Sequence, residues 1–119
     1  MLVITRHRTP IDGFPTLDAA VTQAREVLAL FADRPGFIRG WVARAVDDAA
    51  VLVLAHEWTD VGSYRRALGS YEIKLHALFL QSAADEASAF EILTERSPDA
   101  FTDHVTAIAD NHEGIDDRL

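Results

Sequence analysis

The sequence predicts an α+β fold with the ferredoxin-like order β-α-β-β-α-β, in which a four-stranded antiparallel sheet carries its helices on one face. Two patterns predict it. Four runs rich in β-branched and aromatic residues lie between turn signals, at 1–8, 37–44, 51–58 and 88–95. Apolar residues recur at helical spacing between the first two runs and again between the last two. The length of 119 residues is that of one domain.

The first helix is expected to begin after Thr16, a suitable N-cap, and to end at Pro35-Gly36. The strand before it should end at Thr9-Pro10, because proline cannot donate a hydrogen bond to a ladder. Polar residues such as Gln23 fall mostly away from the apolar stripe of this helix. The stripe consists of Leu17, Val21, Ala24, Val27, Leu28 and Phe31.

A β-hairpin is predicted from Pro35 to Trp58, with its turn at Asp47-Asp48. Strict alternation in its first strand places Phe37 and Trp41 on the same face. Its second strand, from Val51, is nearly all apolar, which is typical of a strand covered on both faces. Helices cover only one face in this fold. We therefore expect a second copy of the chain on the other, with the two sheets packed face to face.

The second helical region follows Thr59 or Asp60, either of which can cap it. Gly69 interrupts this region and Ser70 can restart it, so the second helix is expected to be split. Its later apolar stripe consists of Ile73, Leu75, Leu78 and Phe79.

The fourth strand is expected over 88–95, with Pro98 ending it. We divide the chain into a domain at 1–97 and an acidic C-terminal helix or tail at 98–119. Residues 99–119 hold six acidic residues against one arginine, a net charge of −5 that leaves −3 for the rest of the chain. A last amphipathic turn is predicted from Phe101, Val105 and Ile108.

The composition excludes several classes of function. A net charge of −8 argues against nucleic acid as a partner. The absence of cysteine excludes disulfides and thiol nucleophiles. No run of 18 apolar residues could span a membrane, and the N-terminal apolar run is too short for a signal peptide, so we expect a cytoplasmic protein. The five histidines do not show the spacing of a metal site.

Several short segments resemble the antibiotic-biosynthesis-monooxygenase family of dimeric α+β barrel proteins, over roughly residues 1–95. The matching segments are PGF at 35–37, HEW at 56–58, the Thr59-Asp60 cap, Tyr64, the Gly69-Ser70 break, Lys74, His76 and AFEIL at 89–93. The resemblance implies a dimeric α+β barrel. One group of this family oxidises phenols, anthrones or quinols with O₂ and no cofactor. A group similar in fold binds haem through a helix histidine and degrades it.

Both groups typically use an asparagine on a strand and a tryptophan on the second helix. Here the matching positions fall near Thr5 and Ala67, and the only asparagine, Asn111, lies in the tail. The histidine position of the haem-degrading group falls on His76. The chain therefore departs from the family at the pair of residues associated with activity.

His76 is the first candidate for chemistry, as a base toward a phenol or as an axial haem ligand. His7 is the second imidazole candidate, and it shares a strand face with Thr5. The alternatives are a locally hydrogen-bonded histidine at a helix flank for His76 and an exposed strand end for His7.

Three residues near the helix break could contact a substrate. Tyr64 or Tyr71 could donate a hydrogen bond to a developing oxyanion. Arg65 could hold a phenolate or a carboxylate. The alternative is a solvated helix face, with Tyr64 as a core anchor.

His56 and Glu57 point to opposite sheet faces, so they cannot act on one group together. We expect one of them inside, and a glutamate there would pair with Arg39 or Arg44 on the facing strand.

Three functions follow as hypotheses. The first is a cofactor-independent monooxygenase for a small electron-rich aromatic, with His76, Tyr64 and His7 as catalytic candidates and with Thr5, Tyr71 and Arg65 binding substrate. The second is a haem-binding or haem-degrading protein that uses His76. The third is a non-enzymatic ligand-binding homodimer.

Overall fold

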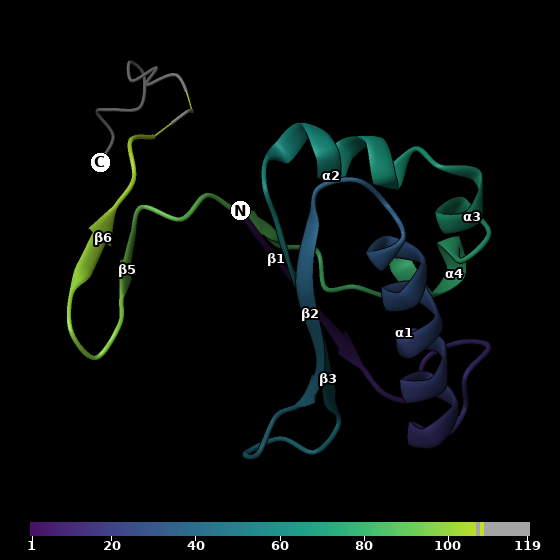
Figure 1. Cartoon of the computed structure of the whole chain (residues 1–119). Coiled ribbons are helices and arrows are strands. Elements are labelled where there is room, and N and C mark those ends of the chain that lie inside the picture. The colour runs from purple at the N-terminus through teal and green to yellow at the C-terminus, as the bar shows by residue number, and fades with distance from the viewer. Residues whose placement is uncertain (107, 109–119) are drawn as a thin grey trace, which may run out of the picture.

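A computed structural model describes residues 1–106 and 108 and places the helices on one side of a four-stranded antiparallel sheet (Figure 1). The strands follow the spatial order β2-β3-β1-β4. They are β1 (Leu2–Arg8), β2 (Phe37–Arg44), β3 (Val51–Trp58) and β4 (Ala89–Phe90). The helices are α1 (Leu17–Ala32), α2 (Val61–Leu68), α3 (Tyr71–Lys74) and α4 (Ala77–Leu80). The predicted ferredoxin-like α+β fold is confirmed.

Helix α1 begins as predicted. The Thr16 hydroxyl oxygen accepts a hydrogen bond from the Ala19 amide at 3.1 Å and so satisfies one of the free donors of the first turn. Most of its buried residues belong to the expected stripe or adjoin it, but Gln23 is also buried, against expectation. A buried amide needs a partner, and the partner of Gln23 is described with the site below.

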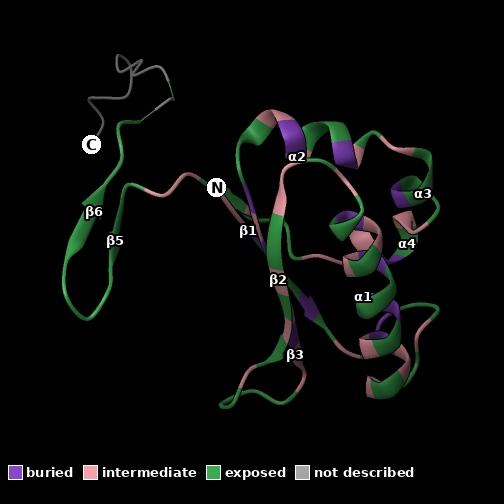
Figure 2. Ribbon diagram, in the orientation of Figure 1, coloured by how far each residue is buried: buried purple, intermediate pink, exposed green. Residues whose placement is uncertain are grey.

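The sheet separates a closed face from an open one. Leu52, Leu54, His56 and Trp58 alternate along β3 and are buried under the helices, whereas the residues between them are only partly covered. The strand is therefore covered on one face within the chain. Figure 2 shows the buried residues gathered between sheet and helices. The covered side of the sheet is called the helix face, and the other side the open face.

A β-bulge in β2 changes one expected orientation. The register with β3 shifts between Phe37 and Arg39, so that Phe37 faces Trp58 while Trp41 faces Ala55. Phe37 therefore lies on the helix face, where its ring meets the Trp58 ring edge-on at 5.4 Å. The prediction that Phe37 and Trp41 share a face was wrong, because one extra residue reverses the alternation.

Gly40 lets helix α1 approach β2 closely. A Cβ atom at this position would lie 2.5 Å from Leu28 Cδ1 and 3.0 Å from the Ala55 carbonyl oxygen. Any other residue would require the Leu28 side chain to shift and would crowd the Ala55 carbonyl oxygen.

The second helical region is split, as predicted, and more finely than predicted. Asp60 is the cap, accepting a hydrogen bond from the Ser63 amide at 2.7 Å. Helix α2 ends at Gly69 and α3 starts after Ser70. A further break at His76 separates α3 from α4.

The C-terminal region differs from the prediction. The fourth strand is only two residues long, and the chain then leaves the sheet. A separate hairpin follows, made of β5 (Thr94–Arg96) and β6 (Phe101–Asp103). The helical turn expected from Phe101 is therefore wrong, and the boundary drawn after residue 97 falls in the turn of this hairpin. Alternation and amphipathic spacing are hard to distinguish over so few residues.

The described part of the chain contains no helix long and apolar enough to cross a membrane. The cytoplasmic location stays a prediction.

Candidate functional site

His7 lies in the core with both ring nitrogens hydrogen-bonded. It is 1% exposed and stacks on the Phe79 ring, with 4.5 Å between the ring centroids. Its Nδ1 lies 2.8 Å from Ser82 Oγ, and its Nε2 lies 2.8 Å from Thr5 Oγ1. The expected exposed strand end is thus a buried, fully bonded side chain.

The hydrogen bonds around His7 define its protonation. The Ser82 hydroxyl donates to the Phe79 carbonyl oxygen at 2.6 Å, so its oxygen is free to accept from His7 Nδ1–H. His7 Nε2 then accepts from the Thr5 hydroxyl, for which the other acceptor within reach, the Leu54 carbonyl oxygen, is more distant at 3.4 Å. Burial lowers the pKa of His7 to about 4, which keeps the ring neutral near pH 7. Thr5 and His7 are brought together as predicted, inside the core.

His56 forms a second buried site at the other end of the helix face. Its ring is 2% exposed and stacks on Phe31 at 4.6 Å between centroids. Its Nδ1 accepts a hydrogen bond from Trp58 Nε1 at 2.6 Å, so the neutral ring carries its proton on Nε2. Burial lowers the pKa of His56 to about 4. The aromatic ring of Tyr64 meets His56 edge-on at 5.7 Å, and burial raises the pKa of this tyrosine.

Glu57, next to His56 on β3, forms an ion pair with Arg39. As expected, the side chains of His56 and Glu57 point to opposite faces. His56 is the one inside, and Glu57 points outward, where Arg39 Nε donates to its carboxylate at 3.0 Å. The pairing of Glu57 with Arg39 is confirmed, although it lies on the open face and the histidine is the residue inside.

His76 is half-buried at the break between α3 and α4, where its Nδ1 is hydrogen-bonded to the Gln23 side-chain amide. This contact explains why Gln23 is buried, and it ties α1 to the second helical region. Sequence periodicity assigned Gln23 to the polar side. The contact could have been predicted only by pairing the Gln23 amide with the His76 ring across two helical segments that pack together.

The predicted site residues do not converge on one cavity. Tyr64 lies in the aromatic cluster with His56, away from the Thr5–His7 pair. Tyr71 is 72% exposed, and Arg65 is exposed on α2. Their roles in binding or catalysis stay predictions.

A pocket with a volume of about 610 Å³ lies between α1 and the edge strand β2. Its wall is mostly apolar, and Trp41 and Phe37 supply aromatic surface. The lining residues from β2 come from both faces of the strand, so the pocket wraps around the free edge of the sheet. The predicted site residues are absent from its lining, and no sequence pattern pointed to it.

Two arginines give this pocket a positive charge. Arg25 from α1 and Arg44 from β2 both line it, and neither has a carboxylate partner among the described residues. Arg44 Nε donates to the Ala49 carbonyl oxygen at 2.8 Å, which fixes the side chain beside the strand. The other lining residues are Val21, Leu28, Ala29, Ala32, Phe37, Gly40, Trp41, Val42, Ala43 and Leu52. The arrangement suits a flat apolar ligand that carries a negative charge.

No cluster of three metal-ligating side chains occurs in the described part of the chain. For haem, the Gln23 contact uses Nδ1 of His76 and leaves Nε2 as the nitrogen that would face iron. However, the pocket-lining residues of α1 lie on a different side of that helix from Gln23, and His76 does not line the pocket. The pocket and His76 therefore do not fit together as a haem site.

No protein-family model matches the sequence, and no curated protein matches it. Solved structures do. SnoaB, a cofactor-independent oxygenase from Streptomyces nogalater, is 23% identical and superposes with a TM-score of 0.64 over 82% of this chain and 94% of its own. Rv0793 from Mycobacterium tuberculosis is 16% identical, with a TM-score of 0.62 over 81% and 97% of the two chains. An antibiotic biosynthesis monooxygenase is 15% identical, with a TM-score of 0.56 over 89% and 100%.

These similarities confirm the resemblance that the sequence suggested, at the level of three-dimensional structure. The protein has the fold of the antibiotic-biosynthesis-monooxygenase family.

Proposed function

We propose that this protein is a cofactor-independent oxygenase that acts on a small, electron-rich and acidic aromatic compound of the phenol, anthrone or quinol type. The observation that carries the proposal is the pocket between α1 and β2. Its volume of about 610 Å³ lies within the range of small-molecule sites. Its apolar wall and its two arginines suit an aromatic anion. The fold shared with SnoaB supports the reaction class.

The chemistry follows from the charge of the pocket. The guanidinium groups of Arg25 and Arg44 stabilise a phenolate or enolate over its protonated form, which lowers the pKa of the bound substrate. The anion gives one electron to O₂, and the resulting substrate radical and superoxide combine at carbon to form a peroxide anion. This anion takes back a proton from water and becomes a hydroperoxide. Loss of water from the hydroperoxide leaves a carbonyl. In sum, the CH₂ group of an anthrone and O₂ become C=O and H₂O, whereas a phenol loses its O–H and one ring C–H hydrogen to give a quinone and H₂O.

The lining of the pocket restricts the substrate further. None of the lining residues is a histidine, aspartate or glutamate, so the lining itself offers no carboxylate or imidazole base. His76 remains the predicted base, with Tyr64 or Tyr71 as the predicted hydrogen-bond donor, although none of these residues lines the pocket. Without such a base, water accepts the proton, and only a substrate that is already acidic would react. The rate should then rise with pH through the pKa of the bound substrate.

Oxygen uptake with a panel of anthrones and quinols tests the proposal. The wild-type protein should consume O₂ faster than the uncatalysed reaction. The double variant Arg25→Ala/Arg44→Ala should raise KM by roughly a hundredfold or more, because each of the two lost charge-assisted contacts is worth about 1.5–3 kcal/mol. Lys74→Ala, which removes a positive charge outside the pocket, is the matched control. Uptake at the uncatalysed rate across the panel would contradict the proposal.

A second candidate is a protein that binds the same ligand class without chemistry. The filled space between sheet and helices favours it, because the His7–Phe79 and His56–Phe31 stacks occupy that space. The residues at the family's asparagine and tryptophan positions differ as well.

Tryptophan fluorescence measures binding independently of turnover. Trp41 lines the pocket and is 47% exposed, whereas Trp58 is fully buried. A quinone ligand should quench the wild type and have little effect on Trp41→Phe, in which only Trp58 remains. Quenching without oxygen uptake would favour the binding protein, and quenching with uptake would favour the oxygenase.

We also propose that the protein is a homodimer in which the open faces of two sheets pack together. The open face carries apolar side chains that are substantially exposed in the single chain, including Ile4, Trp41 and Phe90. Light scattering at micromolar concentration should give about twice the chain mass of 13.1 kDa. A mass of one chain would contradict the dimer.

A further inference from the structure

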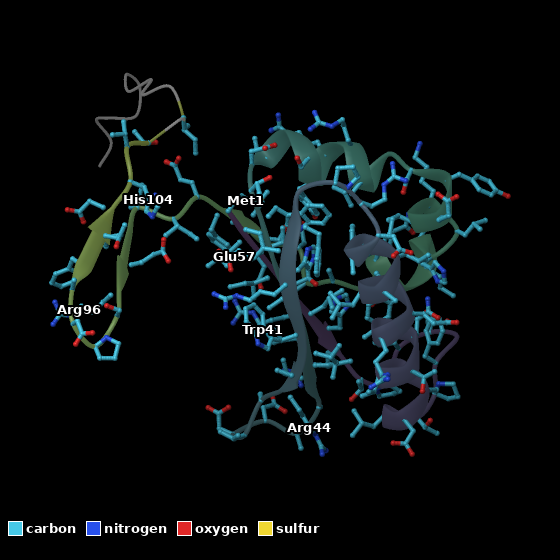
Figure 3. The ribbon with its side chains drawn as sticks, viewed as in Figure 1. Met1, Trp41, Arg44, Glu57, Arg96 and His104 are labelled. Atoms are coloured by element: carbon cyan, nitrogen blue, oxygen red, sulfur yellow. The ribbon has the colours of Figure 1, made fainter. Side chains whose placement is uncertain are left out.

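Arg39 lies between two side chains on the open face of the sheet. Its Nε donates to a Glu57 carboxylate oxygen at 3.0 Å, and its guanidinium carbon lies 5.6 Å from the centroid of the Trp41 ring. Figure 3 shows Glu57 and Trp41 on the same side of the sheet, away from the helices. A guanidinium within about 6 Å of a ring centroid makes a cation–π contact. Arg39 therefore contacts a carboxylate and an indole at the same time.

The strand register brings these three residues together. Arg39 pairs with Glu57 across β2 and β3, and Trp41 follows Arg39 by two positions, on the same face of β2. The Glu57 side chain is only 16% exposed, whereas that of Arg39 is 67% exposed. The carboxylate is therefore the better fixed end of the ion pair, because its neighbours restrict it more. A partly shielded ion pair is also screened less by salt than a fully exposed one.

The Trp41 ring is only lightly packed. The residue is 47% exposed, and its partner across the strands is Ala55, which offers a single methyl group. The ring–ring contacts of the described residues do not include Trp41. An indole on an exposed strand position can adopt more than one rotamer, and a neighbouring group has to select one of them. Arg39 is such a group, because it lies over the ring.

The orientation of this indole matters for the pocket. Trp41 lines the pocket between α1 and β2, whereas Arg39 is not among the lining residues. An aromatic ring has two faces, and the Arg39 guanidinium covers one of them. The other face is available to a flat ligand, because offset stacking of two aromatic rings is favourable. Arg39 can therefore act on a ligand in this pocket through Trp41.

We propose that Arg39 is a positioning residue of the pocket. Anchored by Glu57, it keeps the Trp41 indole in the pocket wall, and an aromatic ligand stacks on the ring face that Arg39 leaves free. This role differs from that of Arg25 and Arg44, which line the pocket and would meet the charge of the ligand directly. The stacking of the ligand rests on the proposed function, because it assumes the same ligand class. The ordering of the indole needs no ligand.

The motion of the indole N–H groups tests the positioning role in the free protein. The chain has two tryptophans, so a ¹⁵N-labelled sample gives two indole signals, which the variant Trp41→Phe assigns. In the wild type, the Trp41 indole should have the order parameter of a rigid group, about 0.85. Arg39→Met, which keeps the side-chain length and removes the charge, should lower it to below about 0.6. Trp58 is the internal reference, because it is fully buried and donates to His56.

Three further variants separate positioning from a general loss of structure. Arg39→Lys keeps a cation that can reach both partners, so it should restore most of the order. Glu57→Ala removes the anchor and should loosen the Trp41 indole as Arg39→Met does. Arg6→Met is the matched control, because it removes another exposed ion pair, with Glu86, from β1 and should leave the indole rigid. A rigid Trp41 indole in Arg39→Met, or equal loosening in Arg6→Met, would overturn the proposal.

Ligand binding tests the stacking on Trp41. A hydroxyanthraquinone should bind Arg39→Met about two- to fivefold more weakly than the wild type, which corresponds to one exposed cation–π contact. In oxygen uptake, KM should rise by the same factor with kcat unchanged, since a contact made equally in the ground state and the transition state is lost. Unchanged affinity in a variant with a mobile indole would overturn the stacking. A wild type that neither binds the anthraquinone nor consumes O₂ would contradict the proposed function instead, and the indole order parameter would still decide the role of Arg39.

Discussion

The two faces of the central sheet both carry apolar side chains, but only one of these faces is covered within the chain. On the helix face, Val3 and Trp58 are fully buried. On the open face, Ile4 is 37% exposed and Trp41 is 47% exposed. The difference teaches where a ligand can go. The helix face is filled by its own side chains, and the open face is uncovered in the single chain. The pocket lies at the edge strand β2, where the two faces meet.

The largest expected effect comes from the helix face. Phe31 is 1% exposed and contacts the rings of His56, Trp58 and Tyr64. Phe31→Ala should lower the free energy of unfolding by about 3–5 kcal/mol, since it leaves a cavity in a packed core. Val46→Ala, at a fully exposed position, should change it by less than about 0.5 kcal/mol. Urea unfolding measures both values. Equal losses of unfolding free energy would show that Phe31 is not part of a closely packed core.

The buried histidines make the helix face sensitive to acid. The pKa of His7 and of His56 is about 4 in the folded protein and 6.5 in the unfolded chain. The unfolded chain therefore binds more protons between these values, and stability falls as the pH drops from about 6.5 toward 4. Each histidine contributes up to about 1.4 kcal/mol per pH unit in that window.

Urea unfolding at pH 7, 6 and 5 measures this dependence above the range in which carboxylates titrate. His56→Gln, which removes one titrating ring, should reduce the slope by about half even if it lowers the stability at pH 7. A flat profile in the wild type would show that the two rings are not held neutral by burial.

The close approach of α1 to β2, beside the pocket, requires the small size of Gly40. A Cβ atom there would collide with Leu28 Cδ1 and crowd the Ala55 carbonyl oxygen, so Gly40→Ala should cost about 1–3 kcal/mol by forcing the Leu28 side chain to repack. Gly69→Ala is the matched control. Its nearest heavy atoms would be 3.5 Å away and its φ is −79°, so alanine should be neutral or slightly stabilising. Thermal unfolding compares the two, and equal stability would show that α1 and β2 are not in close contact.

The smallest effect concerns a surface contact. Asp60 caps α2 through the Ser63 amide, and Asp60→Ala should lower the free energy of unfolding by about 1 kcal/mol. Val61→Ala, next to it and exposed, is the control. If Asp60→Ala lowered the free energy of unfolding as much as Phe31→Ala does, α2 would stabilise the core more than its burial suggests.

Much of the fold follows from local signals in the sequence. Thr16 and Asp60 are caps whose hydroxyl and carboxylate have an amide within reach, and Gly69-Ser70 divides the second helix as expected. The opposite orientations of His56 and Glu57 follow from strand alternation alone. Such features depend on nearest neighbours along the chain, which the sequence specifies directly.

The features that could not be predicted depend on neighbours distant in sequence. Gln23 is polar by composition and buried because His76 lies opposite it, 53 residues away. The bulge that turns Phe37 inward leaves no mark in the alternation. The pocket arises where α1 approaches β2, and its arginines, Arg25 and Arg44, are ordinary surface residues in the sequence. The sequence therefore points to His76, whereas the pocket lies between α1 and β2.

The central claim is that a ligand binds where the two faces meet and not in the closed interior. The most direct measurement is a backbone-amide NMR titration with a hydroxyanthraquinone, a product-like ligand that carries an acidic phenol. Binding in the pocket should shift the amide signals of Leu28, Gly40 and Val42 and leave those of His7 and Phe79 nearly unchanged. The opposite pattern, with shifts concentrated at His7 and Phe79, would contradict the account.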